Sequence, residues 1–132
     1  MKNSKILIVD DDQDLTNAVK IALESEQFVV HSAANRAEGM EKINSDTPDL
    51  IILDVMMKNW SDGFEMSRDL KQDPRFKNIP ILILTAVKEK SGIDFKSTAG
   101  DPDWLPVDGF LNKPVDPHIL LSEVKRILSE KA

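Results

Sequence analysis

The chain has 132 residues, of which 41% are hydrophobic, and its formal net charge at pH 7 is −6. This length supports one hydrophobic core and excludes two ordinary domains, and the acidic balance argues against binding to a nucleic-acid phosphate backbone. The chain has no cysteine, which excludes disulfides and thiolate metal sites, and no apolar run approaches the ~18 residues that span a membrane. We therefore expect a cytoplasmic protein that binds neither nucleic acid nor membrane.

Five short segments, most of them continuously apolar, predict strands of the kind that parallel sheets bury on both faces. The predicted strands are Lys5 to Val9, Phe28 to Ala33, Leu50 to Leu53, Ile81 to Leu84 and Gly109 to Asn112. The third strand ends in a single carboxylate, Asp54, and the fourth ends at Thr85.

Helical spacing of apolar residues predicts helices between these strands and after the last one. The predicted helices are Gln13 to Glu24 with Asp12 as N-cap, Arg36 to Ile43, the stretch from Gly63 to about Lys71, and Asp116 to Lys131. The stretch Val87 to Asp108 resists assignment, although Lys88 to Ser97 could supply a short helix.

Strand and helix alternate along the whole chain, which predicts an α/β fold with parallel strands joined by right-handed helical crossovers. We expect one five-stranded parallel sheet, doubly wound, with helices on both faces, and its expected order, 2-1-3-4-5, rests on resemblance to a known family as much as on this pattern. Strands one and three flank the switch point of such a sheet, where ligands bind beyond the carboxyl ends of the strands. Asp10 and Asp11 should therefore lie beside Asp54.

Three carboxylates in one crevice repel one another unless a cation lies among them. Ligands that are all oxygen, with room for water, suit Mg²⁺. The fourth strand delivers the hydroxyl of Thr85 to the same edge, and the fifth delivers the ammonium of Lys113. A nucleophilic carboxylate, a divalent cation, a hydroxyl donor and a fixed positive charge are together what transfer of a phosphoryl group requires.

Four motifs resemble those of the receiver domain of two-component response regulators. They are VDDD at the end of strand one, LDVMM around Asp54, LTA at Thr85 and Ala86, and NKP at Lys113 and Pro114. The resemblance covers the whole chain, and it implies a flavodoxin-like fold with residues 1–132 as a single receiver domain.

The resemblance also implies roles for the acidic residues. Asp54 corresponds to the phosphoacceptor, which takes a phosphoryl group from a sensor histidine kinase or a histidine phosphotransfer protein. Asp11 corresponds to the direct Mg²⁺ ligand, Asp10 acts through water, and the backbone carbonyl of Met56 resembles the remaining protein ligand.

The same resemblance implies a switch. Thr85 would hydrogen-bond a phosphoryl oxygen and shift toward it, while Lys113 would pair with another oxygen. Phe110 occupies the position of the switch aromatic, which turns inward as the threonine moves. The resulting change of surface would be recognised by a downstream protein target.

The chain departs from the family pattern in two places. Lys58 stands where most receivers have a proline, and the following Asp62-Gly63 comes one residue late. The interval from Thr85 to Lys113 is longer than usual, which leaves the fourth helix, a major part of the partner surface, undetermined. His31 has no candidate metal ligand beside it in the sequence, so a structural or surface role is the expectation.

Two other classes of function compete with this interpretation. A Mg²⁺-dependent phosphatase of the haloacid dehalogenase type also uses an Asp nucleophile, but it requires a second Asp where this chain has Met56. A receiver-like module could instead bind partners without phosphorylation, although the complete acidic set speaks against it. A nucleotide hydrolase is excluded because the chain has no glycine-rich loop ending in Gly-Lys-Ser/Thr.

The sequence ends at Ala132, within a few residues of the last predicted helix. We expect either a single-domain regulator that works by protein contact or a fragment of a longer protein.

Overall fold

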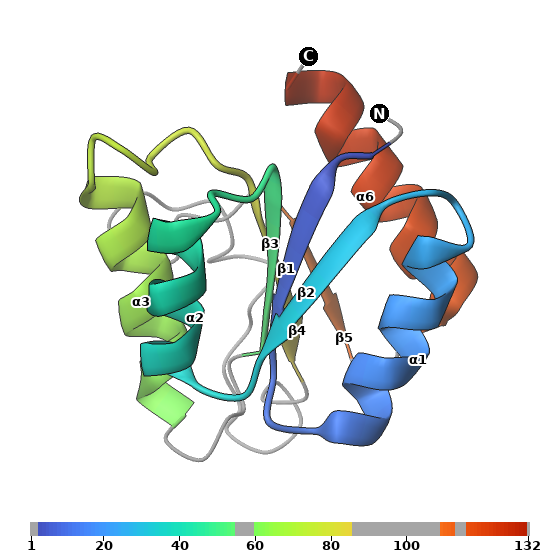
Figure 1. Cartoon of the computed structure of the whole chain (residues 1–132), viewed down its shortest axis with the longest axis horizontal. Coiled ribbons are helices and arrows are strands. Elements are labelled where there is room, and N and C mark those ends of the chain that lie inside the picture. The colour runs from blue at the N-terminus through green and yellow to red at the C-terminus, as the bar shows by residue number, and fades with distance from the viewer. Residues whose placement is uncertain (1–2, 55–59, 86–108, 113–115, 132) are drawn as a thin grey trace.

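Five parallel strands form one sheet in the order β2-β1-β3-β4-β5 (Figure 1). The structure is a computed structural model and describes residues 3–54, 60–85, 109–112 and 116–131. The strands are β1 Lys5–Val9, β2 Val29–Ala33, β3 Leu50–Asp54, β4 Ile81–Thr85 and β5 Gly109–Asn112. The predicted strand order is confirmed.

Within the described residues, four helices cover the two faces of this sheet. They are α1 Gln13–Glu24, α2 Arg36–Ser45, α3 Trp60–Gln72 and α6 Pro117–Lys131. Figure 1 shows α2 and α3 on one side of the sheet and α1 and α6 on the other, as a doubly wound fold requires. None of the helices in the described part of the chain is long and apolar enough to cross a membrane.

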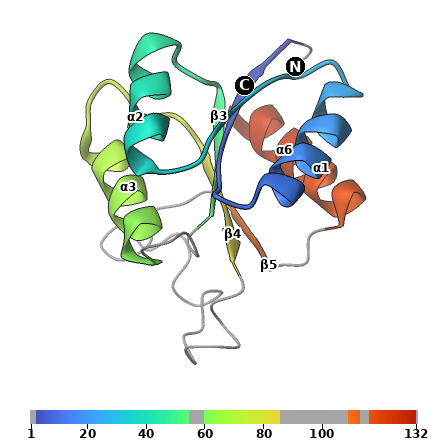
Figure 2. The same cartoon turned by 60° about the horizontal axis from the view of Figure 1, so that its bottom comes forward.

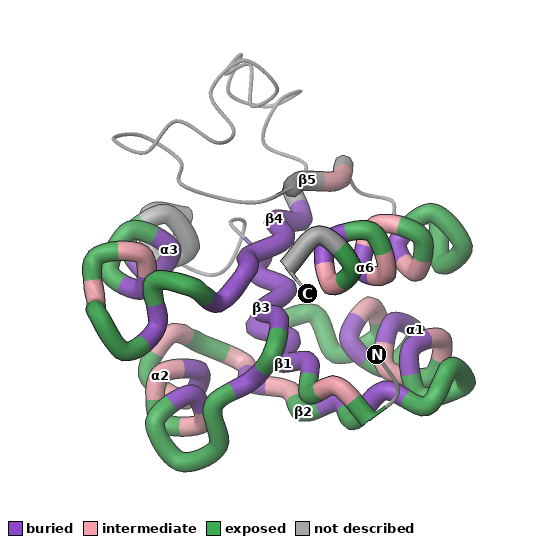
Figure 3. The backbone as a smooth tube through the Cα atoms, turned by 90° about the horizontal axis from the view of Figure 1, so that it is seen from above, coloured by how far each residue is buried: buried purple, intermediate pink, exposed green. Residues whose placement is uncertain are grey.

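The central strands β1, β3 and β4 are almost continuously apolar because both of their faces are buried, whereas the edge strand β2 contains His31 and Ser32 (Figure 3). In β1, Leu7 and Val9 pack toward α2 and α3, whereas Ile6 and Ile8 pack toward α1 and α6. All five residues of β3 are buried. Two hydrophobic cores therefore hold the sheet from opposite sides, and the polar ends of the strands carry the chemistry.

Side-chain caps fix where three of the helices begin. Asp12 caps α1 as predicted, since its carboxylate accepts the backbone N–H of Leu15 at 3.1 Å. Asn35 caps α2 in the same way, through the N–H of Glu38. Asp116 lies before α6, where its carboxylate accepts the N–H of His118, so the helix begins one residue later than predicted.

Other boundaries also differ from the predictions, and β3 and β4 each end one residue later, at Asp54 and Thr85. Helix α3 begins at Trp60 and contains Gly63, because glycine in a first helical turn costs only about 1 kcal/mol. Helix α2 continues past Ile43 to Ser45. Phe28 precedes β2, because its N–H donates to the carbonyl of Leu23 and closes the turn after α1. The predicted short helix from Lys88 to Ser97 lies outside the described residues.

The apolar spacing that predicts the helices includes Ala18 in α1, Ala37 in α2 and Ile119 in α6, but all three of these residues are exposed. Residues spaced three apart drift around a helix of 3.6 residues per turn, so Ala37 leaves the face that buries Ile43. Besides Ile43, α2 buries Gly39, where an added Cβ would lie 3.1 Å from a methyl group of Val9 and 3.1 Å from the terminal methyl of Met66. This glycine lets α2 pack closely on β1.

Candidate functional site

The carboxyl ends of the strands meet along one edge of the sheet, which is turned toward the viewer in Figure 2. Val9 pairs with Leu53, so Asp10 and Asp54, each one residue further along, reach the same level. At the other side of β3, Thr85 pairs with Asn112. The edge therefore gathers the carboxyl ends of four different strands.

Three carboxylates converge at this edge between β1 and β3. Asp10, Asp11 and Asp54 each offer an oxygen, and these oxygens all lie within 4.8 Å of one another. Asp10 and Asp54 are buried, each 1% exposed, whereas Asp11 is exposed. The structure thus brings together the three acids that the sequence placed at the switch point.

Backbone hydrogen bonds fix Asp10 at the end of β1. Its N–H donates to the carbonyl of Ala33 at 3.0 Å, which ties it to the end of β2. Its Oδ1 accepts the backbone N–H of Asp12 at 2.9 Å. The carboxylate is therefore oriented by the turn that leads into α1.

The donor set fits a hard divalent cation. All three groups are carboxylates, and oxygen-only ligands suit Mg²⁺ better than a metal that prefers nitrogen or sulfur. The exposed position of Asp11 leaves that side open to water, and Mg²⁺ keeps several waters when it binds to proteins. A cation among these groups also offsets their mutual repulsion.

The other predicted site residues are placed only in part. Thr85 ends β4 and Phe110 lies in β5, where the backbone is described. Met56 and Lys113 lie outside the described residues, so their predicted roles are not tested.

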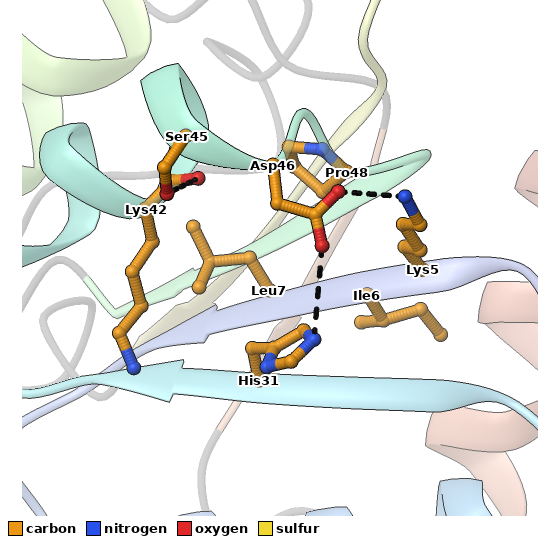
Figure 4. Close-up of a pocket in the computed structure, with 8 residues that line it drawn as sticks. All are labelled: Lys5, Ile6, Leu7, His31, Lys42, Ser45, Asp46 and Pro48. Atoms are coloured by element: carbon orange, nitrogen blue, oxygen red, sulfur yellow. Dashed lines mark hydrogen bonds and ion pairs between the residues drawn. The ribbon is translucent and has the colours of Figure 1, made fainter.

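A hollow of about 230 Å³ lies on the α2 face of the sheet and was not predicted (Figure 4). It is lined by Lys5, Ile6, Leu7, His31, Lys42, Ser45, Asp46 and Pro48. The Nζ of Lys5 donates to Asp46 at 2.6 Å, and the Nε2 of His31 lies 4.0 Å from the same carboxylate. The hydrogen bond from Lys5 lowers the pKa of Asp46, and the same bond raises the pKa of Lys5.

The charges around this hollow are balanced by one another. Lys42 donates to the carbonyl of Ser32 at 2.5 Å and lies 4.0 Å from Glu38. His31 is exposed, in line with the surface role expected from the sequence. The hollow therefore presents to solvent a wall of charged groups that are already engaged with neighbouring residues.

A family model described as the response regulator receiver domain matches residues 6–125. The chain belongs to this family. The match covers most of the receiver, from β1 into α6, and it confirms the family that the four sequence motifs indicated.

Curated relatives of this receiver are longer proteins. The chain is 35% identical over 126 residues to the alkaline phosphatase synthesis transcriptional regulatory protein PhoP of Bacillus subtilis, covering 96% of the receiver and 49% of that protein. It is also 35% identical over 126 residues to the hybrid signal transduction histidine kinase D of Dictyostelium discoideum, of which it covers 8%. The receiver spans half or less of the length of these two relatives.

Solved structures resemble the receiver over nearly all of its length. The CheY-like response regulator receiver domain protein of Methanospirillum hungatei has a TM-score of 0.81 at 26% identity, and the alignment covers 97% of this chain and 95% of that one. The chemotaxis response regulator CheY4 of Vibrio cholerae has a TM-score of 0.76 at 30% identity, with coverage of 94% and 98%. The receiver thus has the flavodoxin-like parallel sheet that its motifs implied.

Sequence reasoning missed two features of this receiver. One is the hollow beneath α2. The other is the hydrogen bond from the N–H of Asp12 to Asp10. No residue type signals the second feature, because its donor is a backbone N–H.

Proposed function

We propose that this receiver is a phosphorylation-dependent signalling module that accepts a phosphoryl group on Asp54. The observation that carries the proposal is the convergence of Asp10, Asp11 and Asp54 at the switch point of the sheet. Membership of the receiver family supports it independently. The module is not an enzyme that acts on other substrates, because it promotes only the gain and loss of its own phosphoryl group.

The donor in this proposal is a phosphohistidine on a sensor kinase or a histidine phosphotransfer protein. A carboxylate oxygen of Asp54 attacks the phosphorus in line with the bond to the histidine nitrogen. The new P–O bond forms as the P–N bond breaks, and the electron pair of that bond returns to the imidazole, which takes up a proton. The burial of Asp54 keeps bulk water away from the attacking oxygen and from the acyl phosphate that results.

Asp10 and Asp11 would hold Mg²⁺ together with Asp54 and with the backbone carbonyl of Met56. When bound, Mg²⁺ supplies positive charge that offsets the charge of the transferring oxygens. The geometry that supports this assignment is the group of carboxylate oxygens within 4.8 Å of one another.

The switch residues complete the proposal. Thr85 would donate its hydroxyl to one phosphoryl oxygen, and Lys113 would pair with a second. The place of Thr85 at the end of β4, one strand from Asp54, supports this role, and Lys113 directly follows β5. Phe110 would then transmit the change by repacking, since it has no hydroxyl.

The output in this proposal is a changed affinity for a downstream protein partner in the cytoplasm, with no direct binding of nucleic acid or membrane by this chain. The name of PhoP describes a transcriptional regulatory protein, in which the matched receiver is about half of the whole. A receiver of this kind can therefore serve an output that resides in another domain or another protein.

Incubation with acetyl phosphate and Mg²⁺, followed by mass spectrometry, tests the proposal. We expect one added phosphoryl group that is acid-stable and base-labile, and we expect none in Asp54→Asn. Asp14→Asn is the matched control, because it removes an equal charge from the first turn of α1 without touching the cluster. Turnover of the donor without accumulation of phosphorylated protein would identify a phosphatase, and neither incorporation nor turnover in the wild type would identify a module that binds without phosphorylation.

A further inference from the structure

A single residue links the carboxylate cluster to the first turn of α1. Asp12 donates its backbone N–H to Oδ1 of Asp10 at 2.9 Å. Its own carboxylate accepts the N–H of Leu15 at 3.1 Å, and its carbonyl accepts the N–H of Thr16 at 3.0 Å. The same peptide segment therefore orients a site carboxylate on one side and begins the helix on the other.

The side chain of Asp12 has a different task from those of its two neighbours. Asp10 and Asp11 belong to the group that can share a cation, and Asp12 does not. The carboxylate of Asp12 is directed to the helix, and its backbone is extended, with φ −86° and ψ 102°. An N-cap needs this non-helical backbone, and here the same backbone presents the N–H to Asp10.

We infer that Asp12 is a positioning residue for the cation site, acting through Asp10. A carboxylate that accepts a fixed N–H has its plane set before a cation arrives, and outer partners of this kind commonly change metal affinity tenfold or more. The cap fixes the N–H, because the bond to Leu15 holds residue 12 in its extended conformation. This inference rests on the proposed function, since it assumes that the cluster binds Mg²⁺.

Three substitutions of Asp12 distinguish the effect of losing the helix cap from the effect of losing the negative charge. Asp12→Ala removes both, whereas Asp12→Asn and Asp12→Ser remove the charge and keep an oxygen that can accept the N–H of Leu15. We expect the dissociation constant for Mg²⁺, measured by calorimetry, to rise about five- to tenfold in the alanine variant and to change less than twofold in the other two. In the metal-free protein, the amide proton of residue 12 should lose the NMR signature of a hydrogen bond in the alanine variant alone.

Asn35→Ala provides the matched control. Asn35 caps α2, and that helix supplies none of the three cluster carboxylates. We expect Asn35→Ala to lower thermal stability as Asp12→Ala does while leaving the dissociation constant for Mg²⁺ unchanged. An equal effect of both variants on Mg²⁺ would show a general loosening of the fold and would overturn the inference.

The remaining outcomes also decide the matter. Equal weakening in all three Asp12 variants would assign the effect to charge, and unchanged affinity in Asp12→Ala would remove any positioning role. Both results overturn the inference and leave the proposed function standing. A wild-type protein that binds no Mg²⁺ would instead contradict the proposed function itself, and the inference would fail with it.

Discussion

The buried hydroxyl of Thr16 in α1 lowers the stability of the fold, and a single substitution can remove it. Thr16 is only 2% exposed, and no described residue forms a hydrogen bond with its Oγ1. Burying an unbonded hydroxyl costs about 1–3 kcal/mol, and valine has nearly the same shape and helix propensity as threonine. We expect Thr16→Val to raise the free energy of unfolding by about 1–2 kcal/mol. For a domain of this length that gain raises Tm by about 4 °C per kcal/mol.

Calorimetry and urea unfolding followed by circular dichroism measure this effect. Thr47→Val is the matched control, because the hydroxyl of Thr47 donates to the carbonyl of Ile43 at 3.2 Å and its loss brings no gain. Thr16→Ser keeps the hydroxyl and removes a buried methyl group, so it should lower stability by about 1 kcal/mol. A Tm for Thr16→Val equal to or below the wild-type value would refute the reasoning.

Three further predictions concern the site, the ion pair of the hollow and the packing of α2. Asp11→Ala should abolish Mg²⁺ binding in calorimetry while the circular dichroism spectrum stays unchanged, and retained binding would contradict the site. The hydrogen bond from Lys5 lowers the pKa of Asp46 in the folded protein below its ordinary value of 3.8. The bond therefore stabilises the fold fully above pH 3.8, and this stabilisation is lost as the pH falls through the lowered pKa of the folded state. The Tm advantage of wild type over Asp46→Asn should accordingly shrink between pH 5 and strongly acidic pH, and a constant difference would argue against the pair. Gly39→Ala gains ~1 kcal/mol of helix propensity, but the added Cβ lies 3.1 Å from a methyl group of Val9, and this crowding costs ~1–3 kcal/mol. Urea unfolding should therefore show that the free energy of unfolding falls by about 1 kcal/mol. A rise would show that β1 moves to accommodate the methyl group.

The strands followed from the sequence because a strand buried on both faces leaves a continuous apolar run, whereas their order followed from the resemblance to receivers as much as from this pattern. A lone carboxylate at the end of such a run, as at Asp54, is then conspicuous. The start of α3 could not be predicted, because Asp62 and Gly63 are equally typical of a turn and of a first helical turn. The hollow depends on where α2 ends above β1, which is a matter of packing between elements rather than of local pattern.

The link between Asp12 and Asp10 was beyond prediction for another reason. The donor is a backbone N–H, which every residue except proline possesses, so the residue type at position 12 reports only the cap. The sequence revealed the acids of the cluster, but it could not show which of their oxygens accept hydrogen bonds from the main chain.

The burial of β3 holds Asp54 rigidly, whereas Asp11 of the same cluster is exposed to solvent. Asp54 ends a strand in which every residue is buried and which is bonded to β1 and β4 along its two edges. We expect amides of such a strand to exchange with deuterium only when the whole domain opens, whereas the side chain of Asp11 is exposed to solvent. In the proposed reaction the acceptor Asp54 would therefore be fixed in space before a cation or phosphoryl group arrives, and the reorganisation would fall on the side chain of Asp11.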